Sequence, residues 1–162
     1  MIRKFQDKFL FVSAILLFMA GAAKLLSAMG KASALAVPDP LLSISNRNLF
    51  LAMGSLELAL SAFLLVSQAD QWRVMLIAWL ATNFIAYRAG LWWMGEPNLC
   101  NCLGDLSGYV ALPPRILNDA ALVMLAWLTL GSYGFLLLGL FGRRKAAKTK
   151  LPSDLRSAAA GA

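Results

Sequence analysis

Four long apolar runs, separated by short polar or proline-containing segments, dominate the chain. They cover residues 9–27, 49–67, 72–94 and 116–141. Each run is close to the roughly 20 residues that an α-helix needs to cross the hydrocarbon core of a bilayer. The pattern therefore predicts an all-α integral membrane protein, a four-helix bundle with antiparallel spans, and the lipid bilayer as its surroundings.

The first apolar run has a second interpretation, because a signal peptide also begins with a basic segment and an apolar stretch. The basic residues 1–8 precede the run, and a small-residue pattern at residues 34–36 offers a cleavage site. Lys24, near the end of the run, and Lys31, after it, precede that site, where a cleavable segment is expected to be short and uncharged. We therefore favour a membrane span.

The overall composition agrees with a membrane protein. Hydrophobic residues make up 60% of the chain and charged residues 14%, whereas soluble domains average about 45–50% and about 25%. The chain has no histidine, which excludes bis-histidine haem ligation and zinc or copper sites built on histidine. Its two cysteines are too few for a structural zinc site, which needs four ligands. No metal site is predicted.

The distribution of basic residues predicts the orientation in the membrane. Ten Lys and Arg residues lie in the two terminal segments and at the start of the third run, against three in the other two connections. Cytoplasmic loops carry the excess of basic residues. Both termini are therefore predicted to be cytoplasmic, in a multi-pass protein of the inner (cytoplasmic) membrane, with the 95–115 loop facing the periplasm or exterior.

The C-terminal tail, residues 142–162, is basic at first and then rich in alanine and serine. This composition predicts a disordered cytoplasmic segment. Aromatic residues do not alternate with its basic ones, as they would in a nucleic-acid-binding patch, so no nucleic acid partner is predicted.

The only two cysteines, Cys100 and Cys102, are one residue apart in the 95–115 loop. A disulfide between them would close a very short loop and would add little to stability, because that stabilisation grows with loop length. Strained or exposed disulfides are the labile ones, and the outer side of the membrane is where disulfides persist. The pair is therefore predicted to be redox-active.

Each apolar run contains one ionisable residue in its outer half. These residues are Lys24, Glu57, Arg88 and Asp119. A charge in the hydrocarbon costs about 2.5–3.5 kcal/mol on insertion scales, so we expect a paired cluster beneath the cysteine loop. In this hypothesis Lys24 and Arg88 stabilise a thiolate or the anion of a membrane quinone, and Glu57 or Asp119 carries protons. The alternative is that the cations extend to the interface and Glu57 pairs with one of them structurally.

Three polar residues of the third run, Thr82, Asn83 and Tyr87, are further candidates for lining this pocket. Residues of these types also form simple hydrogen bonds between membrane helices, and that alternative stays open. The tryptophans at the two ends of the same run are typical of an interfacial aromatic belt.

Several of these motifs resemble a known family. Gly21-Ala22-Ala23-Lys24-Leu25 resembles a signature of DoxX-like membrane proteins. The segments that resemble the MauE branch of that group are Asp39-Pro40-Leu41-Leu42, Leu56-Glu57-Leu58, Tyr87-Arg88-Ala89-Gly90-Leu91 and Cys100-Asn101-Cys102-Leu103-Gly104. The resemblance covers residues 9–140 and implies a four-helix, redox-associated membrane protein. It also implies methylamine utilisation, with a thioredoxin-like partner, for MauE and thiosulfate–quinone oxidoreduction for DoxX relatives.

The sequence leaves three functional hypotheses. The first is thiol–disulfide exchange by Cys100 and Cys102 with a thioredoxin-like or secreted partner, with either a membrane quinone or a second protein to reoxidise the pair. The second is a non-catalytic assembly or anchoring subunit of a membrane redox complex. The third is copper handling, because a thiolate pair selects Cu(I).

Overall fold

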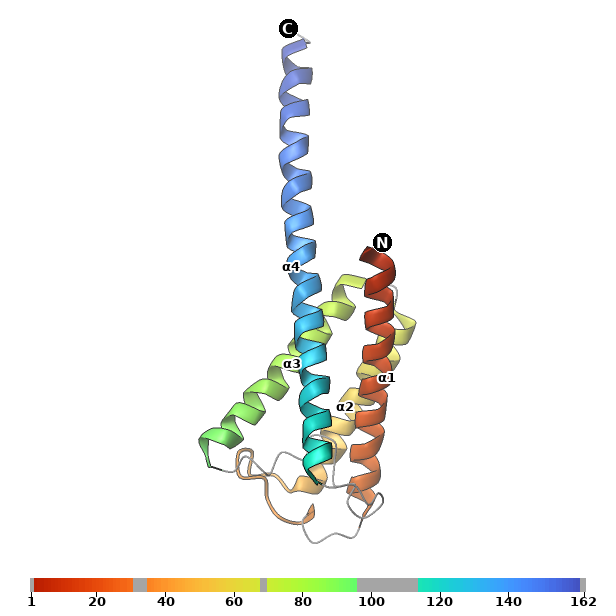
Figure 1. Ribbon diagram of the computed structural model, residues 1–162, viewed down its shortest axis with the longest axis vertical. Helices are drawn as coiled ribbons and strands as arrows, with labels where there is room; N and C mark the ends of the chain where they lie inside the picture. Colours follow the sequence, from red (N-terminus) through yellow and green to blue (C-terminus); the bar gives the residue numbers. More distant parts are fainter. Residues whose placement is uncertain (1, 31–34, 68–69, 96–113, 161–162) are drawn as a thin grey trace.

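The structure is a computed structural model that describes residues 2–30, 35–67, 70–95 and 114–160. In this part of the chain the regular structure is helical, in the order α1 (Ile2–Met29), α2 (Asn46–Val66), α3 (Asp70–Trp93) and α4 (Pro114–Ala160). Successive helices run in opposite directions, so the start of α1 and the far end of α4 lie at the same end of the bundle (Figure 1). The predicted all-α antiparallel bundle is confirmed.

All four helices are long and apolar enough to cross a membrane. The candidate spans are Lys4–Met29, Asn46–Val66, Gln71–Trp93 and Asn118–Leu140. Large apolar side chains cover the outside of the bundle; Phe18, Leu65 and Leu130 are 55%, 56% and 76% exposed. Such a surface is stable against lipid, and the chain is a multi-pass membrane protein.

The helix ends differ from the predicted ones mainly at the two termini of the chain. α1 begins at Ile2, although the apolar run begins at residue 9. α4 continues to Ala160, where the sequence predicts disorder from residue 142. Segment 142–160 is rich in Ala, Lys, Arg and Leu, which have the highest helix propensities. The helix therefore continues as a long extension beyond the bundle (Figure 1).

The helices pack mainly as two pairs, α1 with α2 and α3 with α4. Gly21 and Gly54 allow the backbones of the first pair to approach closely. A Cβ atom on Gly21 would lie 2.9 Å from the carbonyl oxygen of Gly54, and one on Gly54 would lie 3.0 Å from the carbonyl oxygen of Gly21. Nearer the end of the bundle that contains the start of α1, Ser61 of α2 donates a 2.8 Å hydrogen bond to the carbonyl of Ala14.

The apolar core joins the two pairs in the half of the bundle that contains the start of α1. Phe9 of α1 packs against Trp127 and Phe135 of α4, with ring centroids 5.7 and 5.3 Å apart. Its ring lies over Gly131, where a Cβ atom would be only 2.1 Å from the ring. The buried residues of this core are Phe9, Leu10, Ala14, Leu17, Leu64, Val74, Ile77, Leu80, Ala81 and Leu128.

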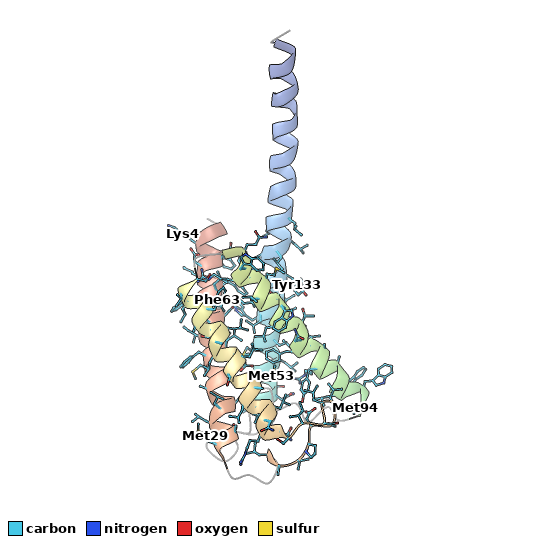
Figure 2. All side chains as sticks on the ribbon, turned by 180° about the vertical axis from the view of Figure 1, so that it is seen from behind. Lys4, Met29, Met53, Phe63, Met94 and Tyr133 are labelled. Atoms are coloured by element: carbon cyan, nitrogen blue, oxygen red, sulfur yellow. The ribbon has the colours of Figure 1, made fainter. Side chains whose placement is uncertain are left out.

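α3 leans away from the other helices toward its C-terminal end (Figure 1). Met29 and Met94, at the ends of α1 and α3, lie at the end of the bundle opposite Lys4 (Figure 2). We call this the outer end, following the orientation predicted from the basic residues. Serines are buried in the other half as well, but the buried charged residues of the described chain, Lys24, Asp39 and Glu57, lie in this outer half.

Candidate functional site

A buried ion pair joins α1 and α2 in the outer half of the bundle. Lys24 and Glu57 each follow a glycine of the close helix contact by three residues, and because α1 and α2 are antiparallel the pair lies across the contact of Gly21 with Gly54 (Figure 1). Glu57 is level with Gly21, since its Cβ would lie 3.1 Å from a Cβ atom on that glycine. Lys24 Nζ donates a hydrogen bond to Glu57 Oε1. Their side chains are only 5% and 0% exposed, so the close helix contact holds both charges away from lipid and water.

α3 contributes an aromatic ring and a second cation to the same region. Lys24 Nζ lies 5.2 Å from the centroid of the Phe84 ring, within the range of a favourable cation–π contact. Arg88 follows Phe84 by one turn and lies on the same face of α3. Side chains from all four helices line a cavity of about 20 Å³ here; they are Lys24, Glu57, Phe84, Arg88, Ala121, Met124 and Leu125.

Arg88 also connects α3 to α4. Its Nη2 atom donates a 2.6 Å hydrogen bond to Asn118 Oδ1. Its Nη1 atom is buried and has no hydrogen-bond partner among the residues that the structure describes, and the same holds for Glu57 Oε2. Both residues line the cavity. The site therefore has two cations, one carboxylate, and one donor and one acceptor that remain unsatisfied within the described chain.

The structure does not bring Asp119 into this site. Asp119 is exposed, and the cavity lining from α4 consists of Ala121, Met124 and Leu125. Successive residues of a helix point about 100° apart, so the neighbouring Asn118, and not Asp119, faces Arg88. Three of the four predicted charges line one cavity, and the fourth helix contributes a neutral amide. In the sequence, Asn118 could be recognised only as a polar residue near the start of the last apolar run.

The polar residues predicted to line the pocket make other contacts. Thr82 bonds to Tyr133 of α4, with 2.7 Å between the oxygens. Asn83 donates to the carbonyl of Trp79 on its own helix. Tyr87 donates to Asp39 Oδ2 in the connection between α1 and α2. The cavity lining from α3 is Phe84 and Arg88. Thr82 and Tyr87 instead connect α3 to neighbouring segments, and the contact of Asn83 lies within α3.

Asp39 is a buried polar residue that sequence reasoning did not select as a site residue. It is only 3% exposed. Its Oδ1 atom accepts hydrogen bonds from the backbone N–H groups of Leu41 and Leu42 at 3.0 and 2.9 Å. These bonds stabilise a turn in the backbone that follows Asp39. The signal in the sequence was the Asp-Pro pair at residues 39–40, which favours a turn.

This turn is attached to α3. Tyr87 binds Asp39, and one turn further along the helix Gly90 leaves space for Leu41, whose Cδ2 atom would lie 3.0 Å from a Cβ on that glycine. Arg88 lies directly after Tyr87. The contact of the turn therefore helps to fix the part of α3 from which Arg88 reaches the cavity.

Cys100 and Cys102 lie outside the described residues. The segment that contains them connects the end of α3 at Trp93 to the start of α4 at Pro114. Arg88 is five residues before the end of α3, and Asn118 is four residues after the start of α4. The polar site therefore lies at the end of the bundle where the cysteine-containing segment begins and ends.

The cavity is too small for the predicted quinone. Sites that bury an organic ligand usually have volumes of about 300–1,000 Å³, against about 20 Å³ here. A larger cavity of about 410 Å³ lies at the opposite end of the bundle, lined by residues that include Gln6, Phe135 and Leu140. The space between Lys24 and Arg88 therefore does not fit a quinone ring. Among the described residues, no group of His, Cys, Asp or Glu is placed to hold a metal ion.

The chain was compared with known proteins. The family model described as methylamine utilisation protein MauE matches residues 5–132. This match includes most of α1, all of α2 and α3, and the first part of α4, and with them the cysteine pair and every residue that lines the cavity. The searches of curated proteins and of solved structures returned no match.

Proposed function

The chain belongs to the MauE family of methylamine utilisation proteins, and from this premise we propose that it is a membrane-embedded thiol–disulfide exchange protein. Cys100 and Cys102 are its redox pair, on the outer face of the membrane. A thioredoxin-like or secreted protein is its partner. The function rests on the cysteine pair itself, which no other residues of the chain could replace.

The polar site supports this proposal through its position and its charge. Lys24 and Glu57 neutralise each other, which leaves Arg88 as the cation of the cavity without a carboxylate partner among the described residues. A nearby cation favours thiolate over thiol, and the thiolate is the reactive form of cysteine. Arg88, rather than Lys24, is therefore our candidate for stabilising a thiolate, and Glu57 for accepting a proton.

The reaction we propose is a dithiol–disulfide exchange. A thiolate of the partner attacks one sulfur of the oxidised pair, and a mixed disulfide forms while the other cysteine leaves as a thiolate. The second thiol of the partner then attacks the mixed disulfide. Two electrons pass from the partner to the pair, so the partner gains a disulfide and Cys100 and Cys102 become thiols. The protons lost by the partner's two thiols balance those gained by the pair. A second protein with a disulfide restores the oxidised pair by the same chemistry.

Single-cysteine variants test the proposal through the reverse step, because the remaining thiolate can attack a disulfide of a partner and the variant then lacks the second cysteine that would resolve the mixed disulfide. Cys102→Ser and Cys100→Ser are expressed in the source cells, thiols are blocked with an alkylating reagent, and complexes are separated without reductant. We expect at least one variant to form a covalent complex that a reductant dissolves. The double variant Cys100→Ser/Cys102→Ser is the control and forms none.

A non-catalytic assembly subunit would give a different result. Neither single variant would then trap a partner, and the double serine variant would retain the same non-covalent complexes as the wild type. That combination would overturn the exchange proposal. Loss of the protein from the membrane is monitored separately by its abundance in each variant.

A further inference from the structure

Two buried polar atoms at the cavity have no hydrogen-bond partner among the described residues, and they indicate what kind of ligand would bind there. Glu57 is 0% exposed, and its Oε2 atom is a hydrogen-bond acceptor without a donor among the described residues. Arg88 Nη1 is a donor without an acceptor there. A buried polar atom without a partner costs about 1–3 kcal/mol, and more where the group is charged. A ligand that satisfies both atoms at once is therefore strongly favoured.

The chemistry of the lining selects a neutral ligand. The carboxylate of Glu57 would repel an anion, and the guanidinium of Arg88 would repel a cation. A ligand that donates to the first and accepts from the second avoids both repulsions. The remaining lining is apolar, from Phe84 and from three residues of α4. The ligand is thus a single group that is both donor and acceptor, such as a hydroxyl or a water molecule.

The volume of the cavity distinguishes between a ligand that carries a hydroxyl group and a water molecule, and it favours water. About 10–15 Å³ is enough to hold one water molecule by this measure, and the cavity has about 20 Å³. We propose that the cavity binds one water molecule, which donates a hydrogen bond to Glu57 Oε2 and accepts one from Arg88 Nη1. Buried waters of this kind typically satisfy polar groups that the protein leaves unpaired.

This water completes a polar chain through all four helices. Lys24 of α1 binds Glu57 of α2, and Arg88 of α3 binds Asn118 of α4. These contacts lie within the two helix pairs that pack most extensively, α1 with α2 and α3 with α4. The water lies between the two contacts, so it connects one helix pair to the other in the outer half of the membrane. The site does not depend on the thiol chemistry of the loop.

Two substitutions at one position, whose new side chains have nearly the same shape, test this proposal. Ala121 lines the cavity and is 6% exposed. Ala121→Val would replace the water with a methyl group and leave Glu57 and Arg88 unsatisfied. Ala121→Thr would place a hydroxyl there, which can donate to one and accept from the other. We expect the valine variant to unfold several degrees below the threonine variant in detergent.

The same two substitutions at Ala126, an exposed position on the same helix, measure the intrinsic difference between valine and threonine. We expect that difference to be small or to favour valine. If valine at position 121 is as stable as threonine or more stable, after this correction, the cavity is dry and the proposal is wrong.

A structure in lipid nanodiscs, at a resolution that shows ordered water, gives the direct test. The expected result is one density peak within hydrogen-bond distance of both Glu57 Oε2 and Arg88 Nη1. Crystals grown with bromide in place of chloride test for an ion by anomalous scattering. A bromide peak beside Arg88 would show an anion site and overturn the assignment of water.

Discussion

Lys24 of α1 and Glu57 of α2 form an ion pair inside the bundle, where neither side chain is more than 5% exposed. The pair lies across the contact of Gly21 with Gly54, at which the two helix backbones approach closely, and Glu57 Cβ would lie 3.1 Å from a Cβ atom on Gly21. Charge pairing and close backbone packing therefore depend on each other in this protein. A change at the glycines should disturb the charges, and a change in the charges should disturb the helix pair.

Removal of one charge from this pair is expected to be more harmful than removal of both. Lys24→Met leaves the carboxylate of Glu57 without its cation, and breaking a buried pair in this way lowers the free energy of unfolding by about 3–5 kcal/mol. Lys24→Met/Glu57→Leu removes both charges and should lose clearly less. Unfolding by SDS in mixed micelles, monitored by circular dichroism, measures both. A double variant less stable than Lys24→Met would contradict the prediction.

A side chain at Gly21 is expected to separate α1 from α2. In Gly21→Ala the new Cβ atom would lie 2.9 Å from the carbonyl oxygen of Gly54 and 3.1 Å from Glu57 Cβ, so the helix backbones must move. Overpacking of this kind costs about 1–3 kcal/mol. Gly134→Ala is the matched control, because no heavy atom lies within 4 Å of a Cβ there. The same unfolding assay applies, and equal stability of the two variants would rule out the close contact.

The sequence was sufficient to predict the number and direction of the helices, because each apolar run has the length of a span and charges mark the connections. It also identified Lys24, Glu57 and Arg88, since ionisable residues in apolar runs are few. These three side chains line one cavity.

The sequence was not sufficient to predict which side of a helix faces inward near its end. Asn118 and Asp119 are adjacent, and nothing in the apolar pattern shows that the amide, and not the carboxylate, reaches Arg88. That choice depends on the rotation of α4 against α3. Tertiary contacts such as that of Phe9 with Gly131 set this rotation, and they are not visible in a single sequence. The same reason explains Asp39, whose partner Tyr87 is 48 residues away.

The contact of Asp39 with Tyr87 is expected to hold the α1–α2 connection on α3 but not to form its turn. Tyr87→Phe removes only the hydrogen bond to Oδ2. Asp39→Ala also removes the Oδ1 contacts to the amides of Leu41 and Leu42. Hydrogen exchange should therefore show these two amides protected in Tyr87→Phe and exchanging at least tenfold faster in Asp39→Ala. Fast exchange in both variants would mean that the turn forms only when it is docked on α3.

The cysteines are expected to react from the side of the membrane opposite the two termini. Four antiparallel helices place both termini on one side, and ten of the Lys and Arg residues lie on that side against three on the other, which predicts a cytoplasmic location for the termini. In right-side-out vesicles treated with a reductant, a maleimide that cannot cross membranes should label Cys100 and Cys102. The control is the variant Cys100→Ser/Cys102→Ser/Ser157→Cys, whose single cysteine lies in the C-terminal segment. It should be labelled only after detergent opens the vesicles. If the native cysteines also require detergent, the cysteine loop faces the cytoplasm and exchange with a secreted partner is excluded.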